Sequence, residues 1–380
     1  MKSPQVGVVA TFFNVAEYAA EMVDSVLGQT YTDIRLVLVD NDSPDGVGAI
    51  LDEYSARHVN VQVIHNSPNL GAAQSKQLGV EVLLDDHEIK YIAVLDGDDI
   101  VHEDYIKNLV EMLESTGADQ ASILAESLFK DARSALPRFN PNATSVFKSI
   151  ADAYSIGHAD EIYSLMDHPL WCKIYRAELF RDITWQSPAS RIIDDIPLVV
   201  QLRAKVKNGF AVNTWRGMYY RRRKSSLVLK NYFNSDVNLQ ENLARSKQIL
   251  DFKLNLDAML NEKFGNPAQE TDLALQKKFY EGYLNENIYS HFVYLSCLMP
   301  ISKGIYTRGL DVQVRGFMRA EFSDADFAVS TGKQRLVQRL FQLGYVPFKS
   351  AILLLYKLGK INSLPSRDEL LQLECGKYFD

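Results

Sequence analysis

The first hundred residues alternate between short apolar runs and longer segments in which apolar residues recur at helical spacing. Four apolar runs have the length and composition of buried strands: 6–10, 34–39, 59–64 and 91–95. Helical spacing is found between them, over 15–27, 50–54 and 69–84. This alternation predicts βαβ units and a mostly parallel α/β sheet flanked by helices.

Polar side chains follow each of these strands. Asn14 follows the first strand, residues 40–46 the second, Asn69 the third, and Asp96-Gly97-Asp98-Asp99 the fourth. The carboxyl ends of parallel strands meet at one edge of a sheet, where open α/β sheets bind ligands. We therefore expect these clusters to form one site.

The pattern changes along the rest of the chain. A strand is expected over 121–128 and a loop at 135–144. The segments 169–175 and 211–220 bracket the acidic pair Asp194-Asp195, which starts an apolar helix from 196 to 202. Helical patterns dominate from about 232, over 237–260, 273–297 and 334–358. We predict a catalytic domain at 1–230 and a mostly helical domain at 231–380.

Composition narrows the function classes. The chain has 380 residues and a formal net charge of −7, which argues against a nucleic-acid partner. Its three cysteines show no metal or redox spacing, as is usual in a reducing compartment. No apolar run reaches the roughly 18 residues of a membrane span, and residues 1–6 lack the apolar core of a signal peptide. These features predict a cytoplasmic protein.

The acidic cluster at 96–99 is the strongest chemical signal. Three carboxylates at the end of a buried strand repel one another unless a cation lies among them. Mg²⁺ or Mn²⁺, held by one or two carboxylates and by substrate phosphates, fits this pattern. A solvated acidic turn or a helix N-cap are the alternatives.

Several motifs in order resemble family 2 glycosyltransferases, which are inverting, nucleotide-sugar-dependent enzymes with a GT-A (Rossmann-like) fold. The stretches that carry the resemblance are 11–18, 24–31, 39–46, 69–79 and the Leu-Asp-Gly-Asp-Asp run at 95–99, which matches the DxD motif. The resemblance covers about the first 230 residues. The chain departs from the family pattern at Thr11, Phe13, Asn41, Asp42 and Lys76, where proline, tyrosine, aspartate, glycine and arginine are usual.

The resemblance implies roles for the donor site. Asp98, with Asp96, would hold Mn²⁺ or Mg²⁺, and Asp40 would read the edge of the nucleobase, typically uracil. Phe13 would pack near the base and Lys76 near the diphosphate. Core packing for Phe13 and a solvated helix face for Lys76 are the alternatives. The complete set of expected donor-binding residues is Thr11, Phe13, Asn14, Asp40, Lys76, Asp96, Arg221 and Arg223.

The resemblance also implies a catalytic base and an acceptor side. Asp195 matches the second acid of the family's Glu-Asp pair, with Asp194 as the second candidate. A capping role at the start of the following helix is the alternative. Trp171 and Lys173 are expected to line the acceptor side, and the basic run that includes Arg221 either closes over the diphosphate or forms a basic surface.

The resulting prediction is a metal-dependent glycosyltransferase that moves a sugar, by the resemblance from a UDP-sugar, to a glycan or lipid-linked glycan in polysaccharide biosynthesis. A sugar nucleotidyltransferase and an inactive nucleotide-binding or assembly module are the alternatives. The basic amphipathic segment 333–360 predicts peripheral contact with the inner membrane face. A helical subdomain packed on the catalytic domain and a homo-oligomer contact are equally open.

Overall fold

The computed structural model describes residues 4–129, 135–166, 169–183, 195–222, 251, 274–276, 306–321, 339–340 and 343–357. The chain divides into two compact units, 1–222 with 268–276 and 223–267 with 277–380. Apart from residues 251 and 274–276, the helices expected over 237–260 and 273–297 lie outside the described residues.

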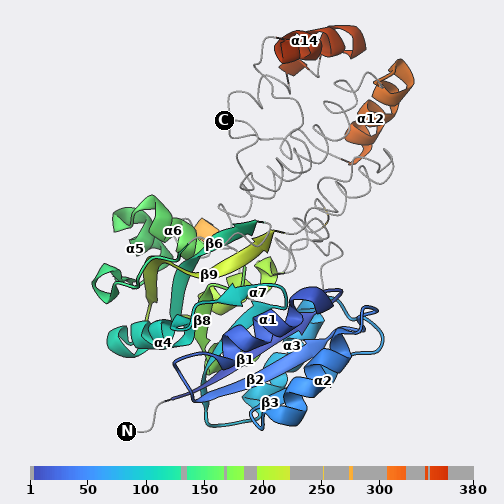
Figure 1. Cartoon of the computed structure of the whole chain (residues 1–380). Coiled ribbons are helices and arrows are strands. Elements are labelled where there is room, and N and C mark those ends of the chain that lie inside the picture. The colour runs from blue at the N-terminus through green and yellow to red at the C-terminus, as the bar shows by residue number, and fades with distance from the viewer. Residues whose placement is uncertain are drawn as a thin grey trace. The chain divides into compact units, whose positions relative to one another are not determined.

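A mixed sheet forms the centre of the first unit (Figure 1). Within the described residues it has nine strands: β1 (Gln5–Phe12), β2 (Ile34–Asp40), β3 (Val61–His65), β4 (Ile89–Asp96), β5 (Ile100–Val101), β6 (Gln120–Phe129), β7 (Ser145–Phe147), β8 (Lys173–Arg176) and β9 (Phe210–Arg222). Their order is β3-β2-β1-β4-β8-β6-β9-β5, and β7 pairs with β9. The first four strands are parallel to one another, whereas β8 is antiparallel to β4 and β6. The α/β class predicted from the sequence is confirmed.

Helices cover both faces of this sheet. They are α1 (Ala16–Leu27), α2 (Val47–Arg57), α3 (Ala72–Leu84), α4 (Tyr105–Thr116), α5 (Ile150–Ile156), α6 (Ala159–Met166) and α7 (Ile196–Ala204). Side chains alternate along a strand, so Val8 and Ala10 pack in one core with α1, α2 and α4. Val9 points to the opposite face and packs with α3 and α7. The sheet is therefore buried on both sides, which explains the mainly apolar sequences of β1, β2 and β4.

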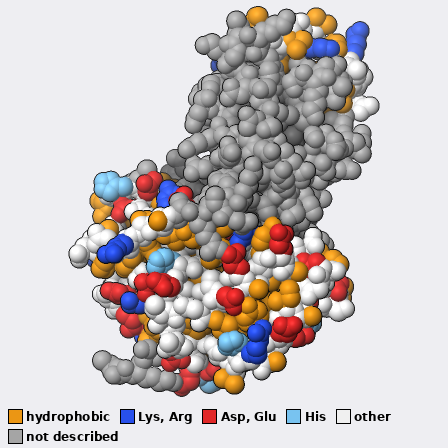
Figure 2. Space-filling model, viewed as in Figure 1, with side chains coloured by type: hydrophobic (Ala, Val, Ile, Leu, Met, Phe, Trp, Pro, Cys, Tyr) orange, Lys and Arg blue, Asp and Glu red, His pale blue; other side chains and the backbone are white. Residues whose placement is uncertain are grey.

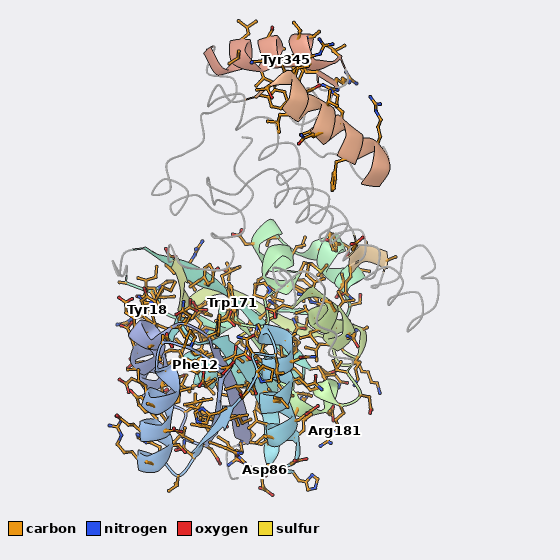
Figure 3. The ribbon with its side chains drawn as sticks, turned by 90° about the vertical axis from the view of Figure 1, so that its right-hand side faces the viewer. Phe12, Tyr18, Asp86, Trp171, Arg181 and Tyr345 are labelled. Atoms are coloured by element: carbon orange, nitrogen blue, oxygen red, sulfur yellow. The ribbon has the colours of Figure 1, made fainter. Side chains whose placement is uncertain are left out.

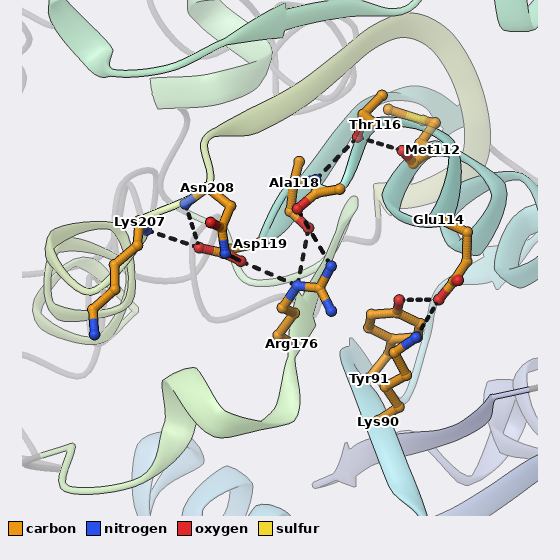
Figure 4. Close-up of polar contacts among 11 residues, drawn as sticks. Lys90, Tyr91, Met112, Glu114, Thr116, Ala118, Asp119, Arg176, Lys207 and Asn208 are labelled. Carbon is orange, nitrogen blue, oxygen red and sulfur yellow. Dashed lines mark hydrogen bonds and ion pairs between the residues drawn. The ribbon is translucent and has the colours of Figure 1, made fainter.

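A polar cluster ties the later strands together, away from the ends of β1 and β2 (Figure 4). Nε of Arg176 lies 3.1 Å from Oδ1 of Asp119, and Oδ2 of Asp119 accepts the backbone N–H groups of Lys207 and Asn208 at 2.8 Å. These hydrogen bonds lower the pKa of Asp119 despite its burial. The cluster fixes β8 and the turn before β9 against β6, so its role is structural.

Two helices of the second unit are described, α12 (Arg308–Glu321) and α14 (Tyr345–Lys357). The hydroxyl of Tyr306 donates to Asp311 at 2.7 Å, and Nζ of Lys349 donates to the carbonyl of Tyr306 at 2.9 Å. Phe348 and Ile352 are buried, so α14 has a packed apolar face. Pro347 lies in the first turn of α14, where proline is tolerated. None of the described helices has both the length and the apolar character needed to cross a membrane.

Candidate functional site

The carboxyl ends of the first four strands meet at one edge of the sheet. Across the pairs, Thr11 lies opposite Asp96, Phe12 opposite Asp40, and Asp40 opposite His65. In the side-chain view, Phe12 and Trp171 lie toward one end of the first unit and Asp86 lies at the other (Figure 3). The surface of this unit mixes acidic and apolar side chains on the face drawn in Figure 2. The register thus brings the predicted polar clusters together.

Gly97 brings the acidic cluster close to the end of β1. Its N–H donates to the carbonyl of Thr11 at 3.0 Å. A Cβ at this position would lie 2.4 Å from the Phe12 ring and 2.7 Å from that carbonyl. Only glycine fits so close an approach, and this turn sets the positions of Asp96 and Asp98.

The three carboxylates of this cluster differ in environment. Asp96 and Asp98 are half-buried, while Asp99 is buried. Burial and the charges of Asp98 and Asp96 raise the pKa of Asp99 well above its usual range. Oδ1 of Asp99 accepts the N–H of Arg221 at 2.9 Å, but its buried Oδ2 has no hydrogen-bond partner in the part of the chain that the structure describes. The next helix, α4, begins at Tyr105 and has Asp104 at its N-cap position, so Asp99 is not a helix cap.

These residues fit a hard divalent cation. Asp96 and Asp98 offer partly exposed carboxylate oxygens, and the buried Oδ2 of Asp99, which has no hydrogen-bond partner among the described residues, lies beside them. No three His, Cys, Asp or Glu side chains in the described part of the chain converge as a closed metal site. Mg²⁺ and Mn²⁺ do not require one, because substrate phosphates and water complete their coordination.

A buried ion-pair cluster links this edge to α7. The ammonium Nζ of Lys76 lies 3.3 Å from Oδ1 of Asp96 and 2.9 Å from Oδ1 of Asp195. The side chain of Lys76 is only 4% exposed, so it is not a solvated helix face. Burial raises the pKa of Asp96, the charge of Lys76 opposes that rise, and the charge of Asp195 adds to it. We call Lys76, Asp96 and Asp195 the lysine cluster.

Asp195 is the residue that directly precedes α7. Its carboxylate makes no capping hydrogen bond to the helix, which argues against the capping alternative. Oδ1 instead faces Lys76, and Oδ2 accepts the N–H of Leu170 at 3.4 Å. The structure therefore holds this carboxylate against the predicted donor site. Asp194 lies outside the described residues.

Asp40 occupies the end of β2. Oδ1 accepts the N–H of Ser43 at 3.1 Å, and Oδ2 lies 3.2 Å from Nδ1 of His65. Nε2 of His65 lies 3.0 Å from Oδ1 of Asp52. We call Asp40, His65 and Asp52 the histidine cluster. Sequence reasoning missed His65 because only the β2–β3 register places it beside Asp40.

Asn41 holds the neighbouring loops together, and its role was also missed. Its buried side-chain oxygen accepts hydrogen bonds from Nδ2 of Asn66 at 3.1 Å and from the N–H of Leu70 at 2.8 Å. Its backbone N–H donates to the carbonyl of Phe12 at 3.0 Å. Asparagine, which stands here in place of the family's aspartate, therefore holds the loop that leads into α3 with a neutral side chain.

The remaining expected donor residues lie at the end of β1. Thr11 is half-buried and the ring of Phe13 is 41% exposed, so a base can reach it and core packing does not account for it. Asn14 has a left-handed backbone (φ 56°), and its N–H donates to Oγ of Ser43 at 2.8 Å. The loop after β2 thus braces the start of α1.

Arg221 is buried and clamps three elements together. Its Nε donates to the carbonyl of Asp98 at 2.8 Å, and its guanidinium pairs with Glu21 of α1. The guanidinium also lies 4.5 Å from the centre of the Tyr18 ring. It therefore secures the acidic turn rather than forming an open basic surface. Arg223 lies outside the described residues.

Trp171 and Lys173 lie in different environments. The ring of Trp171 is partly buried and stacks on Tyr220, with centroids 5.0 Å apart. Lys173 is buried, and its Nζ donates to the carbonyl of Pro169 at 2.9 Å. Of the two, only Trp171 has surface with which to meet an acceptor, and Lys173 braces the segment beside Asp195.

The arrangement matches a known family. Residues 7–183 match the family model for glycosyl transferase family 2. This chain carries a glycosyl transferase family 2 domain. Its fold is similar to the crystal structure of Staphylococcus aureus TarS 1–349 in complex with UDP-GlcNAc, with a TM-score of 0.54 over 93% of this chain and 92% of that chain, at 15% identity. The GT-A fold expected from the sequence is confirmed.

Curated relatives agree on the family. Over 117 residues the chain is 36% identical to glycosyltransferase GlyG of Streptococcus pneumoniae, covering 31% of this chain and 38% of that protein. It is 29% identical over 177 residues to the uncharacterized glycosyltransferase EpsJ of Bacillus subtilis, covering 47% of this chain and 49% of that protein. The chain thus spans about half or less of the length of these relatives.

Proposed function

We propose that this protein is a metal-dependent, inverting glycosyltransferase. It takes a sugar from a nucleotide-diphosphate donor, in our proposal a UDP-sugar, and transfers it to a hydroxyl of a glycan or lipid-linked glycan acceptor. The observation that carries the proposal is the lysine cluster, in which Lys76 joins a carboxylate of the DxD motif to Asp195 at the ligand-binding edge of the sheet.

The chemistry requires a base opposite the leaving group. Asp195 takes the proton of the acceptor hydroxyl while that oxygen attacks the anomeric carbon. The bond from the anomeric carbon to the phosphate oxygen breaks, and its electron pair leaves with the nucleoside diphosphate. The ammonium of Lys76, 2.9 Å away, pairs with this carboxylate and holds it in one orientation.

Asp96 and Asp98 would hold Mn²⁺ or Mg²⁺, which when bound would neutralise charge on the diphosphate. Arg221 fixes the backbone of Asp98 through its carbonyl, and so keeps the acidic turn in place. Phe13 offers an exposed ring face to the nucleobase of the donor, and Asp40 offers a carboxylate to the N–H edge of that nucleobase. The complex of TarS with UDP-GlcNAc is in keeping with a donor of this class.

The proposed cellular location of the protein follows from the proposed acceptor. A lipid-linked acceptor of polysaccharide biosynthesis would place the enzyme in the cytoplasm, at the inner membrane face. In the basic segment 333–360, Val346 and Leu354 of α14 are exposed. Membrane contact and homo-oligomer formation through this segment stay predictions.

The test is donor hydrolysis across a panel of nucleotide sugars, with Mn²⁺, Mg²⁺ or EDTA. We expect one donor to be hydrolysed, and chelation or Asp98→Asn to reduce the rate by at least about 100-fold. Asp160→Asn is the matched control, because Asp160 is an exposed acid in the first turn of α6. Hydrolysis that is indifferent to both EDTA and Asp98→Asn would overturn the metal assignment.

A further inference from the structure

His65 lies between two carboxylates that come from different elements. Its Nδ1 is 3.2 Å from Oδ2 of Asp40 on β2, and its Nε2 is 3.0 Å from Oδ1 of Asp52 on α2. The side chain of Asp40 is 11% exposed, that of His65 is 45% exposed and that of Asp52 is 61% exposed. The cluster thus runs from the buried end of β2 to the surface.

The geometry favours the imidazolium form of His65. A neutral imidazole donates from one nitrogen only, whereas the imidazolium donates from both and can satisfy Asp40 and Asp52 together. The hydrogen bond to Asp52 and, next among the favourable interactions, that to Asp40 raise the pKa of His65, and burial opposes them. Asp40 and Asp52 are the charged groups that act on this ring in the described residues.

The backbone at the start of α2 makes room for this contact. A Cβ at Gly48 would lie 2.6 Å from Oδ2 of Asp40 and 3.2 Å from Cε1 of His65. Any other residue would push the two side chains apart unless the backbone moved. The absence of a side chain at 48 is therefore a second, independent feature that serves the Asp40–His65 pair.

The contacts of Asp40 with Ser43 and His65 leave its carboxylate able to accept further hydrogen bonds. Each carboxylate oxygen accepts up to two hydrogen bonds. Among the described residues, Oδ1 of Asp40 has one partner, the N–H of Ser43, and Oδ2 has one partner, Nδ1 of His65. Asp40 held in this way presents a carboxylate acceptor in one orientation. Such an acceptor pairs with a base edge that carries an N–H, as at N3 of uracil, and repels the bare N3 acceptor of cytosine.

We propose that His65, anchored by Asp52, is a positioning residue that fixes the Asp40 carboxylate for selection of a uracil-type base over cytosine. The inference deepens the proposed function and rests on its donor site. It assigns His65 no part in the chemical step, so its loss acts on donor affinity and base preference and leaves kcat nearly unchanged.

The experiment is calorimetric binding of UDP and of CDP, each with Mg²⁺, to the full chain and its variants. We expect the wild type to bind UDP more tightly than CDP. His65→Leu should weaken UDP about tenfold and CDP less than about twofold, because a charge-assisted hydrogen bond acts only on the uracil complex. His87→Leu is the matched control, since His87 is an exposed histidine in the loop before β4.

A second variant guards against a folding defect. Asp52→Asn changes an exposed side chain and should lower the UDP-to-CDP affinity ratio about threefold by weakening the anchor of His65. Equal weakening of both nucleotides, or an unchanged ratio in both variants, would overturn the inference. A wild type that prefers CDP, or binds neither nucleotide, would also overturn it.

The experiments distinguish a failure of the proposed function from a failure of the role proposed for His65. If the wild type binds UDP as expected but no nucleotide sugar is hydrolysed or transferred, the transferase proposal falls while the affinity ratio still tests His65. If sugar is transferred from a donor of another base class and UDP does not bind, the transferase proposal stands and the role of His65 falls.

Discussion

Two clusters at the same edge of the sheet place one cation between two carboxylates, yet they differ in burial and in the kind of cation. In the lysine cluster, a 4% exposed ammonium joins Asp96 to Asp195. In the histidine cluster, a 45% exposed imidazole joins Asp40 to Asp52. Lysine keeps its charge across the physiological range, whereas histidine can lose it. Under the proposed roles, a lysine pairs with the residue that takes a proton, and a titratable histidine pairs with the residue that selects the base.

Removal of Lys76 should produce the largest loss of stability. Lys76→Met leaves two carboxylates close together with no cation between them, and we expect a loss of about 3 kcal/mol in the free energy of unfolding. Urea denaturation at pH 7 measures it. Lys107→Met is the control, because its pair with Asp104 is half-exposed, and should change the same quantity by less than about 0.5 kcal/mol. Equal losses of unfolding free energy in Lys76→Met and Lys107→Met would show that burial does not strengthen the contribution of Lys76.

A Cβ at position 48 should disturb the histidine cluster from outside it. Gly48→Ala places a methyl group 2.6 Å from Oδ2 of Asp40, so we expect UDP affinity to fall about fivefold. Gly316→Ala, in α12, is the matched control because no atom lies within 4 Å of its Cβ. Calorimetry with UDP distinguishes the two. Unchanged affinity in Gly48→Ala would mean that the Asp40–His65 contact does not matter for binding.

The histidine cluster should make base selection depend on pH. Asp52 and Asp40 raise the pKa of His65 above its ordinary value of 6.5. The stabilisation is therefore complete below about 6.5, the unfolded value, and is lost as the pH rises through the higher native value. We expect the UDP-to-CDP affinity ratio to fall over that interval by about threefold. The ratio is the right measure, because protonation of the diphosphate affects both nucleotides alike.

One variant, His65→Leu, sharpens the pH prediction. In His65→Leu the ratio should be low and independent of pH, since no other titrating side chain among the described residues pairs with Asp40. A ratio that falls with pH in this variant as it does in the wild type would assign the titration to another group.

The smallest effect should come from the exposed end of the histidine cluster. Asp52→Asn removes a charge that is 61% exposed, so we expect the free energy of unfolding at pH 6 to fall by less than about 1 kcal/mol. The pKa of His65, followed by NMR of its imidazole carbons, should fall toward its ordinary value. A pKa that does not move would show that Asp52 does not anchor the ring.

Local patterns predicted the first half of the domain well. Unbroken apolar runs marked β1, β2 and β4, and the acids at 96–99 fell at a strand end as expected. Short strands such as β5 and β7 have two or three residues and no readable period, so they were not foreseen. The predicted strand boundaries differ from the observed ones by one or two residues, because strand ends depend on the neighbouring strands.

The site was harder to predict, because its contacts join distant parts of the chain. Lys76 and Asp195 are 119 residues apart, and only the packing of α3 and α7 on the same face brings them together. A basic side chain near the diphosphate was expected at 76, but its ion pairs depend on that packing. Lys173 was expected to line the acceptor side, yet it is buried because β8 lies in the middle of the sheet.

The most direct test compares kcat and KM for donor hydrolysis in Asp195→Asn and Asp40→Asn, with UDP binding measured in parallel. The account predicts that Asp195→Asn lowers kcat by about 100- to 10,000-fold and leaves UDP affinity within about twofold. It predicts that Asp40→Asn mainly raises KM. An Asp195→Asn enzyme with unchanged kcat would contradict the assignment of the catalytic base to the lysine cluster.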